Sequence, residues 1–339
     1  MFEYGVVEAL RNNVLKIITA LLTLVIVVGI FSAFSPLGTL KTVLSGDSIA
    51  PMPAPEVTTY VIDLSASTNP MNQLDALGSG INEFITGQSL GNPFANTPLA
   101  PRSLSVQFIT QNSGQAPRIV LASLTGSRSL YSYIQDKNIN REGAKQLWDA
   151  LINARTQIWQ NQSLISDQAG CANEVVSILG QQQLLPEALA TPARIICQDA
   201  LQSANSLAHL RGFIANPNIT MGSDVAGAVS SSLNNLQAAK SEFPSAHLTL
   251  VMASDMVDEV SLSLPNRLAR SNPKEACKIA RADADSQSSN YQDLNVLLVG
   301  QANSKYPLTL LNQARSYWSC YFNEIGVAKI NQRSDLSRL

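Results

Sequence analysis

Charged residues are scarce in this chain, making up 14% of its 339 residues, well below the roughly 25% of an ordinary soluble domain. Lysine and arginine form no run, and the formal net charge is −2. A nucleic-acid-binding protein normally carries a basic face, so we expect no nucleic-acid partner. Hydrophobic residues reach 45%, which is enough for a substantial core.

Several features that identify enzymes are also missing. The sequence has no P-loop, GxGxxG or DxDxT signature, so nucleotide binding and aspartyl phosphotransfer have no support. Only two histidines are present, His209 and His247, and neither lies close in sequence to a candidate nucleophile. We therefore predict that the chain is not an enzyme. A metal-dependent hydrolase is the alternative, because Mg²⁺ held by carboxylates can activate water.

Cysteine is equally sparse, with four residues and no CxxC pair, so a zinc site is poorly supported. In an exported domain, four cysteines suggest two disulfides. We predict Cys171–Cys197 and Cys277–Cys320, because each pair is local in sequence. Four buried thiols in a reducing compartment are the alternative.

One long apolar run lies near the N-terminus. No charged residue occurs from Ile17 to Phe34, and these 18 residues would form a helix about 27 Å long. The hydrocarbon core of a bilayer is about 30 Å thick. We predict a tail over residues 1–13 and a transmembrane helix over 14–36, ended by Pro36. A cleaved signal peptide, whose apolar region is usually about 7–15 residues long, is one alternative, and a buried soluble helix is another.

Basic residues flank this run unevenly. Arg11 and Lys16 precede it, and Lys41 is the only basic residue soon after it. The bias favours a cytoplasmic N-terminus and an exported C-terminal domain. We therefore predict a single-pass protein, of the bacterial inner membrane given its compact layout, with its domain on the periplasmic or extracellular side. Residues 37–55 contain a Pro-Met-Pro-Ala-Pro run and read as a stiff linker.

Strand-like segments alternate with helical patterns along the rest of the chain. Segments with the β-branched or continuous apolar character of strands are residues 57–64, 103–110, 118–124, 248–253, 294–299 and a short 327–330. Helical patterns cover residues 71–86, about 141–213, 225–240 and 308–322. Such alternation implies βαβ crossovers, so we predict an α/β fold with a doubly wound, mostly parallel sheet over residues 56–335.

Polar side chains lie at the ends of two predicted strands and at the start of one predicted helix. Asp63, Ser65 and Ser67 alternate from the end of the first strand onward, Ser223 opens a predicted helix, and Asp255 closes the strand LTLVMASD. Parallel sheets gather such positions at the carboxyl ends of their strands. Carboxylate and hydroxyl oxygens suit a hard cation such as Mg²⁺, Mn²⁺ or Ca²⁺. A turn that caps the next helix is the alternative explanation of the first group.

This set of residues resembles the von Willebrand factor A (VWA) domain family, whose metal-ion-dependent adhesion site reads DxSxS, then a Thr, then an Asp. The resemblance assigns Asp63, Ser65 and Ser67 to the first motif, Ser223 to the Thr and Asp255 to the last Asp. It implies a doubly wound α/β fold with Mg²⁺, or Mn²⁺ or Ca²⁺, at the top of the sheet. A carboxylate from a protein partner would complete the coordination.

The chain departs from the family pattern at several points. Ser223 replaces Thr and keeps the hydroxyl, with Thr220 as a second candidate, and Met256 stands where the family has Gly. Ser67 and Ser223 are 156 residues apart (223 − 67), farther than in a minimal family member. We therefore predict a helical insertion at about residues 127–216.

Three further acidic residues lie beside the presumed ligands. Asp224 is expected to start a helix, where the helix dipole favours a carboxylate. Asp258 and Glu259 are typical of residues that solvate a loop, with a second cation shell as the alternative. Taken together, we expect a membrane-anchored, metal-dependent protein-binding module of the cell-adhesion type. The alternative is a structural or assembly component of a bacterial envelope complex with a vestigial metal site.

Overall fold

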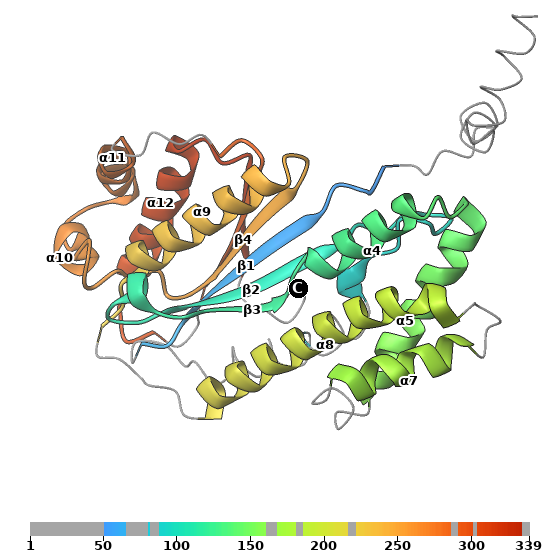
Figure 1. Ribbon diagram of the computed structural model, residues 1–339. Helices are drawn as coiled ribbons and strands as arrows, with labels where there is room; N and C mark the ends of the chain where they lie inside the picture. Colours follow the sequence, from blue (N-terminus) through green and yellow to red (C-terminus); the bar gives the residue numbers. More distant parts are fainter. Residues whose placement is uncertain are drawn as a thin grey trace, which may run out of the picture. The chain divides into compact units, whose positions relative to one another are not determined.

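The computed structural model in Figure 1 describes residues 51–65, 81, 88–160, 168–180, 186–215, 222–285, 291–300 and 304–333. The predicted tail, transmembrane helix and most of the linker lie outside this part. Within the described residues, no helix is both long and apolar enough to cross a membrane. The chain divides into two compact units at Ala50 and Pro51, and the following description concerns the second.

A six-stranded sheet in the order β3-β2-β1-β4-β5-β6 forms the centre of this unit. Its strands are β1 (Glu56–Asp63), β2 (Arg102–Ile109), β3 (Arg118–Ala122), β4 (His247–Ala253), β5 (Leu294–Val299) and β6 (Lys329–Arg333). Every neighbouring pair is parallel except β2 and β3. This confirms the predicted α/β class, and the order is that of a doubly wound sheet, in which the chain changes direction between β1 and β4.

Eight α-helices are present in the described residues. They are α4 (Thr125–Asp136), α5 (Arg141–Gln160), α7 (Gln168–Gly180), α8 (Pro186–Ala215), α9 (Val225–Glu242), α10 (Leu264–Leu268), α11 (Pro273–Ala284) and α12 (Leu308–Glu324), with 3-10 turns η1 (Gln88–Leu90) and η2 (Ser113–Gln115). The predicted helix 71–86 lies outside the described residues apart from Ile81, which is helical. Helix α11 was not predicted, although Asn272 and Glu275 form a capping box at its start with Pro273 at the first position.

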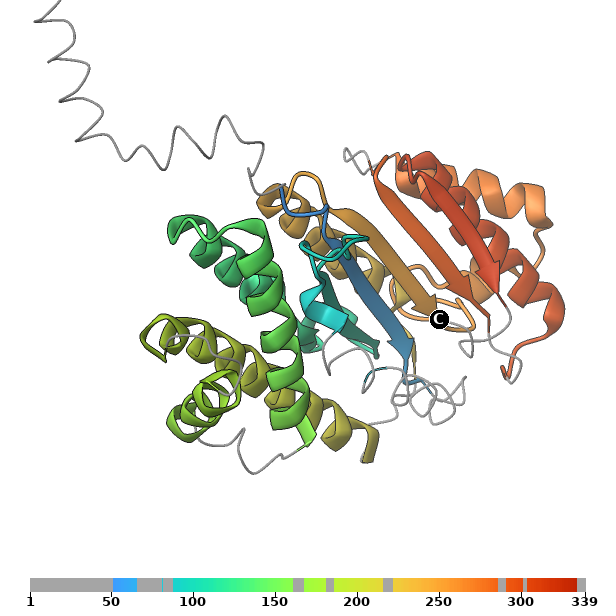
Figure 2. The same ribbon diagram turned by 90° about the vertical axis from the view of Figure 1, so that its right-hand side faces the viewer.

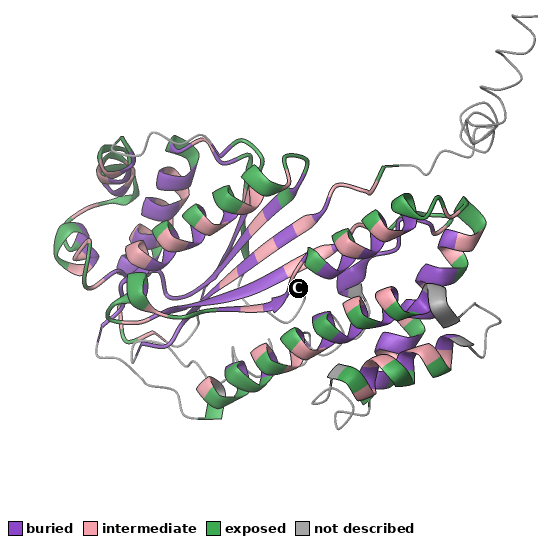
Figure 3. Cartoon of the chain, viewed as in Figure 1, coloured by how far each residue is buried: buried purple, intermediate pink, exposed green. Residues whose placement is uncertain are grey.

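Two hydrophobic clusters hold helices against opposite faces of the sheet. On one face, alternate residues of the central strands, such as Val61 and Met252, pack against α9, α11 and α12. On the other face, residues such as Ile62 and Phe108 pack against α5 and α8. Figure 2 shows these helix layers on either side of the sheet, and Figure 3 shows the burial alternating along β1. Burial alternates from Glu56 to Tyr60 and is continuous from Val61 to Asp63, because the end of the strand beside Asp63 is covered on both faces.

The helices α4, α5, α7 and α8 lie between β3 and α9 in the sequence. Arg155 of α5 and Asp199 of α8 form a buried ion pair, with Nη2 and Oδ2 2.7 Å apart. Cys171 and Cys197 join α7 to α8, and a second disulfide, Cys277–Cys320, joins α11 to α12. Both predicted pairings are confirmed.

Candidate functional site

Two of the predicted metal ligands lie at the carboxyl ends of adjacent parallel strands. Asp63 is the last residue of β1, and Asp255 follows the end of β4 by two residues. Ile62 and Ala253 are register partners across this pair of strands. Because β1 and β4 are the strands at which the order reverses, their carboxyl ends form the crevice where doubly wound sheets bind ligands.

Asp63 is held rigidly and fully buried. Its Oδ1 accepts a hydrogen bond from the backbone N–H of Ser65 at 2.8 Å, and its Oδ2 accepts one from Ser254 Oγ at 2.6 Å. The Ser65 hydroxyl also donates to this carboxyl group. These donors fix the orientation of the carboxylate, and Ser65 is itself buried.

Asp255 is similarly held. Its Oδ1 accepts from the backbone N–H of Val257 at 3.0 Å, and its Oδ2 accepts from Ser304 Oγ at 2.7 Å. The side chain is nearly inaccessible to solvent. The Ser304 bond ties the loop after β5 to the loop after β4, so three strand ends contribute to one site.

Burial raises the pKa of Asp63 to about 7, and the neighbouring carboxylate of Asp255 adds to the rise. The second effect arises because the two carboxyl groups follow the ends of adjacent strands and repel each other when both are ionised. Two acidic groups kept together in a buried position are destabilised when both are ionised. A cation between them would remove this repulsion, because a bound metal ion reverses the local charge balance.

Ser223 reaches the same loop from the start of α9. Its Oγ donates to the carbonyl oxygen of Val257 at 3.1 Å, and its N–H donates to Oε2 of Glu259 at 3.2 Å. A hydroxyl that donates in this way keeps lone pairs for a cation. The structure thus brings Asp63, Ser65 and Asp255 together and links Ser223 to the loop after Asp255. Ser67 and Thr220 lie outside the described residues.

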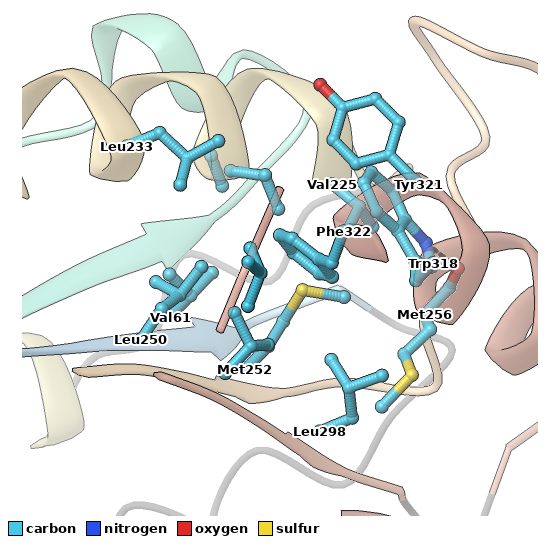
Figure 4. Packing of buried hydrophobic residues seen from close by; sticks show 14 of the residues in the cluster. Val61, Val225, Leu233, Leu250, Met252, Met256, Leu298, Trp318, Tyr321 and Phe322 are labelled. Carbon is cyan, nitrogen blue, oxygen red and sulfur yellow. Dashed lines mark hydrogen bonds between the residues drawn. The ribbon is translucent and has the colours of Figure 1, made fainter. Parts of the chain in front are cut away.

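Met256 adopts the left-handed conformation, with φ of 66°. Its N–H donates to Ser254 Oγ at 2.8 Å, and its carbonyl oxygen accepts from Trp318 Nε1 at 2.9 Å. Figure 4 shows its side chain within the cluster that includes Trp318 and Leu298. The backbone at this position therefore has the conformation that glycine adopts most easily. Met256, which stands where the VWA motif has Gly, thus lies in a turn of the kind that glycine favours.

Asp224 and Asp258 hold the loops around the site in place. Asp224 caps α9 as predicted, since its Oδ1 accepts from the Gly227 N–H at 2.9 Å. Asp258 was expected to solvate a loop, and this prediction is wrong. The residue is fully buried, and its carboxylate accepts from the N–H groups of Ala226 at 2.8 Å and Leu262 at 2.6 Å. The Asp258 carboxylate thus takes the place of water as the acceptor for an N–H group at the start of α9 and for one in the loop.

Glu259 contacts Lys305 and Tyr306 of the segment before α12, which no sequence pattern predicted. Its Oε1 accepts from the hydroxyl of Tyr306 and lies 2.6 Å from Nζ of Lys305. Burial alone would raise the pKa of Glu259, but the bonds from Lys305 and Tyr306 outweigh this effect and lower it. The carboxylates of Asp255 and Asp63 contribute to the raised pKa of Tyr306, after burial and the bond to Glu259, so the Tyr306 hydroxyl belongs to the electrostatic environment of these two carboxyl groups. No sequence motif marks residues 304–306.

Residues 87–91 read Gly-Gln-Ser-Leu-Gly, which matches the GxSxG pattern of serine hydrolases. In those enzymes the serine is exposed on a sharp turn between a strand and a helix. Ser89 instead lies in η1 and is 2% exposed. Within the described part of the chain its hydroxyl has no hydrogen-bond partner, so the match does not form a nucleophile elbow.

Comparison with known families and with characterised proteins finds no match to the sequence. In the part of the chain that the structure describes, no three His, Cys, Asp or Glu side chains gather closely enough to hold a metal ion by themselves. The candidate site has two such side chains, Asp63 and Asp255. Its remaining predicted ligands are the serine hydroxyls.

Proposed function

We propose that this chain is a VWA-type domain that binds a divalent cation and, through it, a protein partner. The single observation that carries the proposal is the pair of buried carboxyl groups, Asp63 and Asp255, that repel each other at the ends of adjacent strands. The motif resemblance adds Ser65, Ser67 and Ser223 as hydroxyl ligands. Mg²⁺ is the first choice, with Mn²⁺ and Ca²⁺ as alternatives, because all five ligands are oxygens.

The donor set fits such an ion. An ionised carboxylate has about four lone-pair positions, so the hydrogen bonds to Asp63 and Asp255 leave acceptor capacity for a metal. When bound, the cation would supply positive charge that a partner's carboxylate can neutralise. The protein residues hold the carboxylates in place and exclude water from around them. We further propose that residues 14–36 anchor the domain in a membrane, with the domain on the exported side, and that it catalyses no reaction.

The second candidate is a structural component of a bacterial envelope complex. The observation that favours it is the helical layer of α5, α7 and α8, in which a disulfide joins α7 to α8 and a buried ion pair joins α5 to α8. In that case the carboxyl pair would be a remnant, and assembly would not respond to chelators.

Metal titration of the full-length chain in mild detergent tests the proposal. Mg²⁺, Mn²⁺ and Ca²⁺ are added to wild type, Asp63→Asn and Asp255→Asn, with heat of binding and thermal unfolding as readouts. The matched control is Asp293→Asn, because Asp293 is largely exposed and pairs with Lys240 away from the site. We expect saturable binding that stabilises wild type and the control.

Both site variants should lose binding while remaining folded. Equal binding by wild type and Asp63→Asn would contradict the metal site. Absence of binding by a folded wild type would favour the structural role, and helices α5, α7 and α8 would then become the surface to examine.

A further inference from the structure

A guanidinium group lies against the sheet at the edge that carries the candidate site. Arg315 of α12 packs over Gly300, the residue that follows β5. A Cβ atom placed on Gly300 would be 2.1 Å from Nη2 of Arg315 and 2.7 Å from its Cζ. The guanidinium therefore occupies the space that a side chain at position 300 would fill. Gly300 is buried and Arg315 is partly buried, so this group is packed onto the fold and does not extend freely into solvent.

The strand register places Gly300 in one row with Asp63. Ala253 of β4 is the register partner of Ile62 in β1 and of Val299 in β5. The next row across these three strand ends consists of Asp63, Ser254 and Gly300. Neighbouring strands are about 4.8 Å apart, so the Cα atoms of the first and last members of this row are about 10 Å apart.

Ser254 connects the two ends of the row. Its hydroxyl donates to Oδ2 of Asp63 at 2.6 Å, and its N–H donates to the carbonyl oxygen of Val299 at 3.3 Å. Alternate residues of a strand share a face, and Met252 and Leu298, two residues before the row, lie in the cluster that packs against α12 (Figure 4). The row and the guanidinium therefore lie on the face of the sheet that α12 covers.

The guanidinium of Arg315 has no counterion in the part of the chain that the structure describes. It forms no ion pair and no hydrogen bond there, although the carboxyl groups of Asp63 and Asp255 lie at the same sheet edge. Two other arginines that are packed onto the fold, Arg155 and Arg267, each pair with an aspartate. A cation that is partly withdrawn from water loses hydration, so it favours an anion that can replace the lost hydrogen bonds.

The charges at this edge favour a carboxylate over a phosphate as that anion. A phosphate monoester carries a charge of about −2 at neutral pH, and the carboxylates of Asp63 and Asp255 would repel it more strongly than a singly charged group. A carboxylate has two coplanar oxygens, which match the paired N–H groups of one guanidinium. The single cation of Arg315 thus fits one carboxylate in charge and in shape.

We infer that Arg315 is a carboxylate-binding residue of the crevice at the ends of β1, β4 and β5. Its ligand is the side-chain carboxylate of an aspartate or glutamate in a bound protein segment. The inference deepens the proposed function and rests on it, because it takes this crevice as the place where a protein partner binds. Gly300 is part of the device, since a larger residue there would displace the guanidinium.

Titration of the full-length chain in mild detergent with a capped Ala-Glu-Ala tripeptide provides the test. The chain carries isotope-labelled arginine, and the Nε–Hε NMR signal of Arg315 is identified by its loss in Arg315→Lys. This signal should move saturably with the Glu tripeptide and stay in place with the matching Gln tripeptide. Arg270 is an internal control, because it is exposed and has no ion pair among the described residues. Its signal should not saturate.

Gly300→Ala is the decisive variant, because it retains the charge of Arg315 and changes only the position of the guanidinium. The φ angle of Gly300 is not positive, so the backbone accepts alanine. Affinity for the Glu tripeptide should fall about tenfold, as expected for the loss of one charge-assisted pair. Gly114→Ala is the matched control, since a Cβ atom there would have no neighbour within 4 Å, and its affinity should equal that of wild type.

Arg315→Lys gives a second readout that does not depend on the NMR signal. Lysine keeps the charge but loses the paired N–H groups, so the Glu tripeptide should raise the melting temperature of wild type and not that of the variant. Equal stabilisation of the two would overturn the inference. So would unchanged affinity in a folded Gly300→Ala, equal shifts of the Arg315 and Arg270 signals, or tighter binding of a matching phosphoserine tripeptide.

Repeating the titrations in EDTA and in Mg²⁺ separates this inference from the metal site. Metal uptake that depends on Asp63, without a saturable shift of the Arg315 signal, would refute the inference and leave the metal site standing. Binding of the Glu tripeptide that depends on Arg315 in EDTA, by a chain that takes up no metal, would support the inference and refute the metal site.

Discussion

Replacing Met256 tests whether the turn after Asp255 has a left-handed backbone. The side chain is 1% exposed within the main core cluster, so Met256→Ala should lower the free energy of unfolding by about 2–5 kcal/mol. Met256→Gly loses the same side chain, but it also removes the steric cost of a left-handed Cβ, about 1–2 kcal/mol. Glycine's greater freedom in the unfolded chain offsets part of this gain. We therefore expect the Gly variant to be more stable than the Ala variant by about 1 kcal/mol.

Met252 provides the matched control. It is buried in the same cluster but lies in the extended strand β4, where glycine is less stable than alanine by about 0.5–1 kcal/mol. Urea unfolding of the four variants, followed by tryptophan fluorescence, gives the two differences. At Met256 the Gly variant should be more stable than the Ala variant, and at Met252 the Ala variant should be more stable than the Gly variant. If Ala is the more stable replacement at both, the explanation of the Met-for-Gly departure is wrong.

Three further predictions concern buried charge and crosslinking. The raised pKa of Asp63 means that the native metal-free protein binds an extra proton between about pH 4 and 7, so its unfolding free energy should fall by about 3 kcal/mol from pH 5 to pH 8. Asp63→Asn should abolish this slope in urea titrations at several pH values. Arg155→Met should destabilise by about 3–5 kcal/mol because it leaves Asp199 buried without its partner, and adding Asp199→Leu should recover most of the loss; unfolding of both variants checks this. Replacing Cys171 and Cys197 by Ser should cost about 3 kcal/mol, measured by thermal unfolding, with an unchanged melting temperature contradicting the crosslink.

The strands of the central sheet could be predicted because parallel strands covered by helices read as apolar runs. The segments around Val61, Leu250 and Leu297 match β1, β4 and β5 closely. Strand β6 extends three residues beyond its predicted end, through Arg333. Its polar, exposed residues carry no apolar signal, because an edge strand is held mainly by backbone pairing.

The candidate site could be predicted only as far as local motifs reach. Asp63 ends β1, and Ser65 and Asp255 each follow a strand by two residues, so their positions follow from the predicted sheet. The contacts of Ser304 and Tyr306 depend on how residues 304–306, which belong to no helix or strand, cross to the loop after β4. Sequence spacing holds no information on such a crossing, since polar loop residues of this kind are common.

The burial of Asp258 shows why acidic residues in loops are hard to interpret. Its neighbours in sequence give it the appearance of a solvated loop residue. In the structure, the backbone N–H of Ala226 at the start of α9 and that of Leu262 in the same loop need an acceptor at that point. Only the tertiary arrangement creates this need, because an unpaired buried amide is costly.

The start of the domain lies at the amino end of strand β1, and the candidate site lies at its carboxyl end. Its eight residues span about 26 Å at roughly 3.3 Å per residue, with Glu56 at one end and Asp63 at the other. Any tether that ends at Pro51 is therefore attached on the side away from Asp63, and a partner can approach the site without passing the point of attachment.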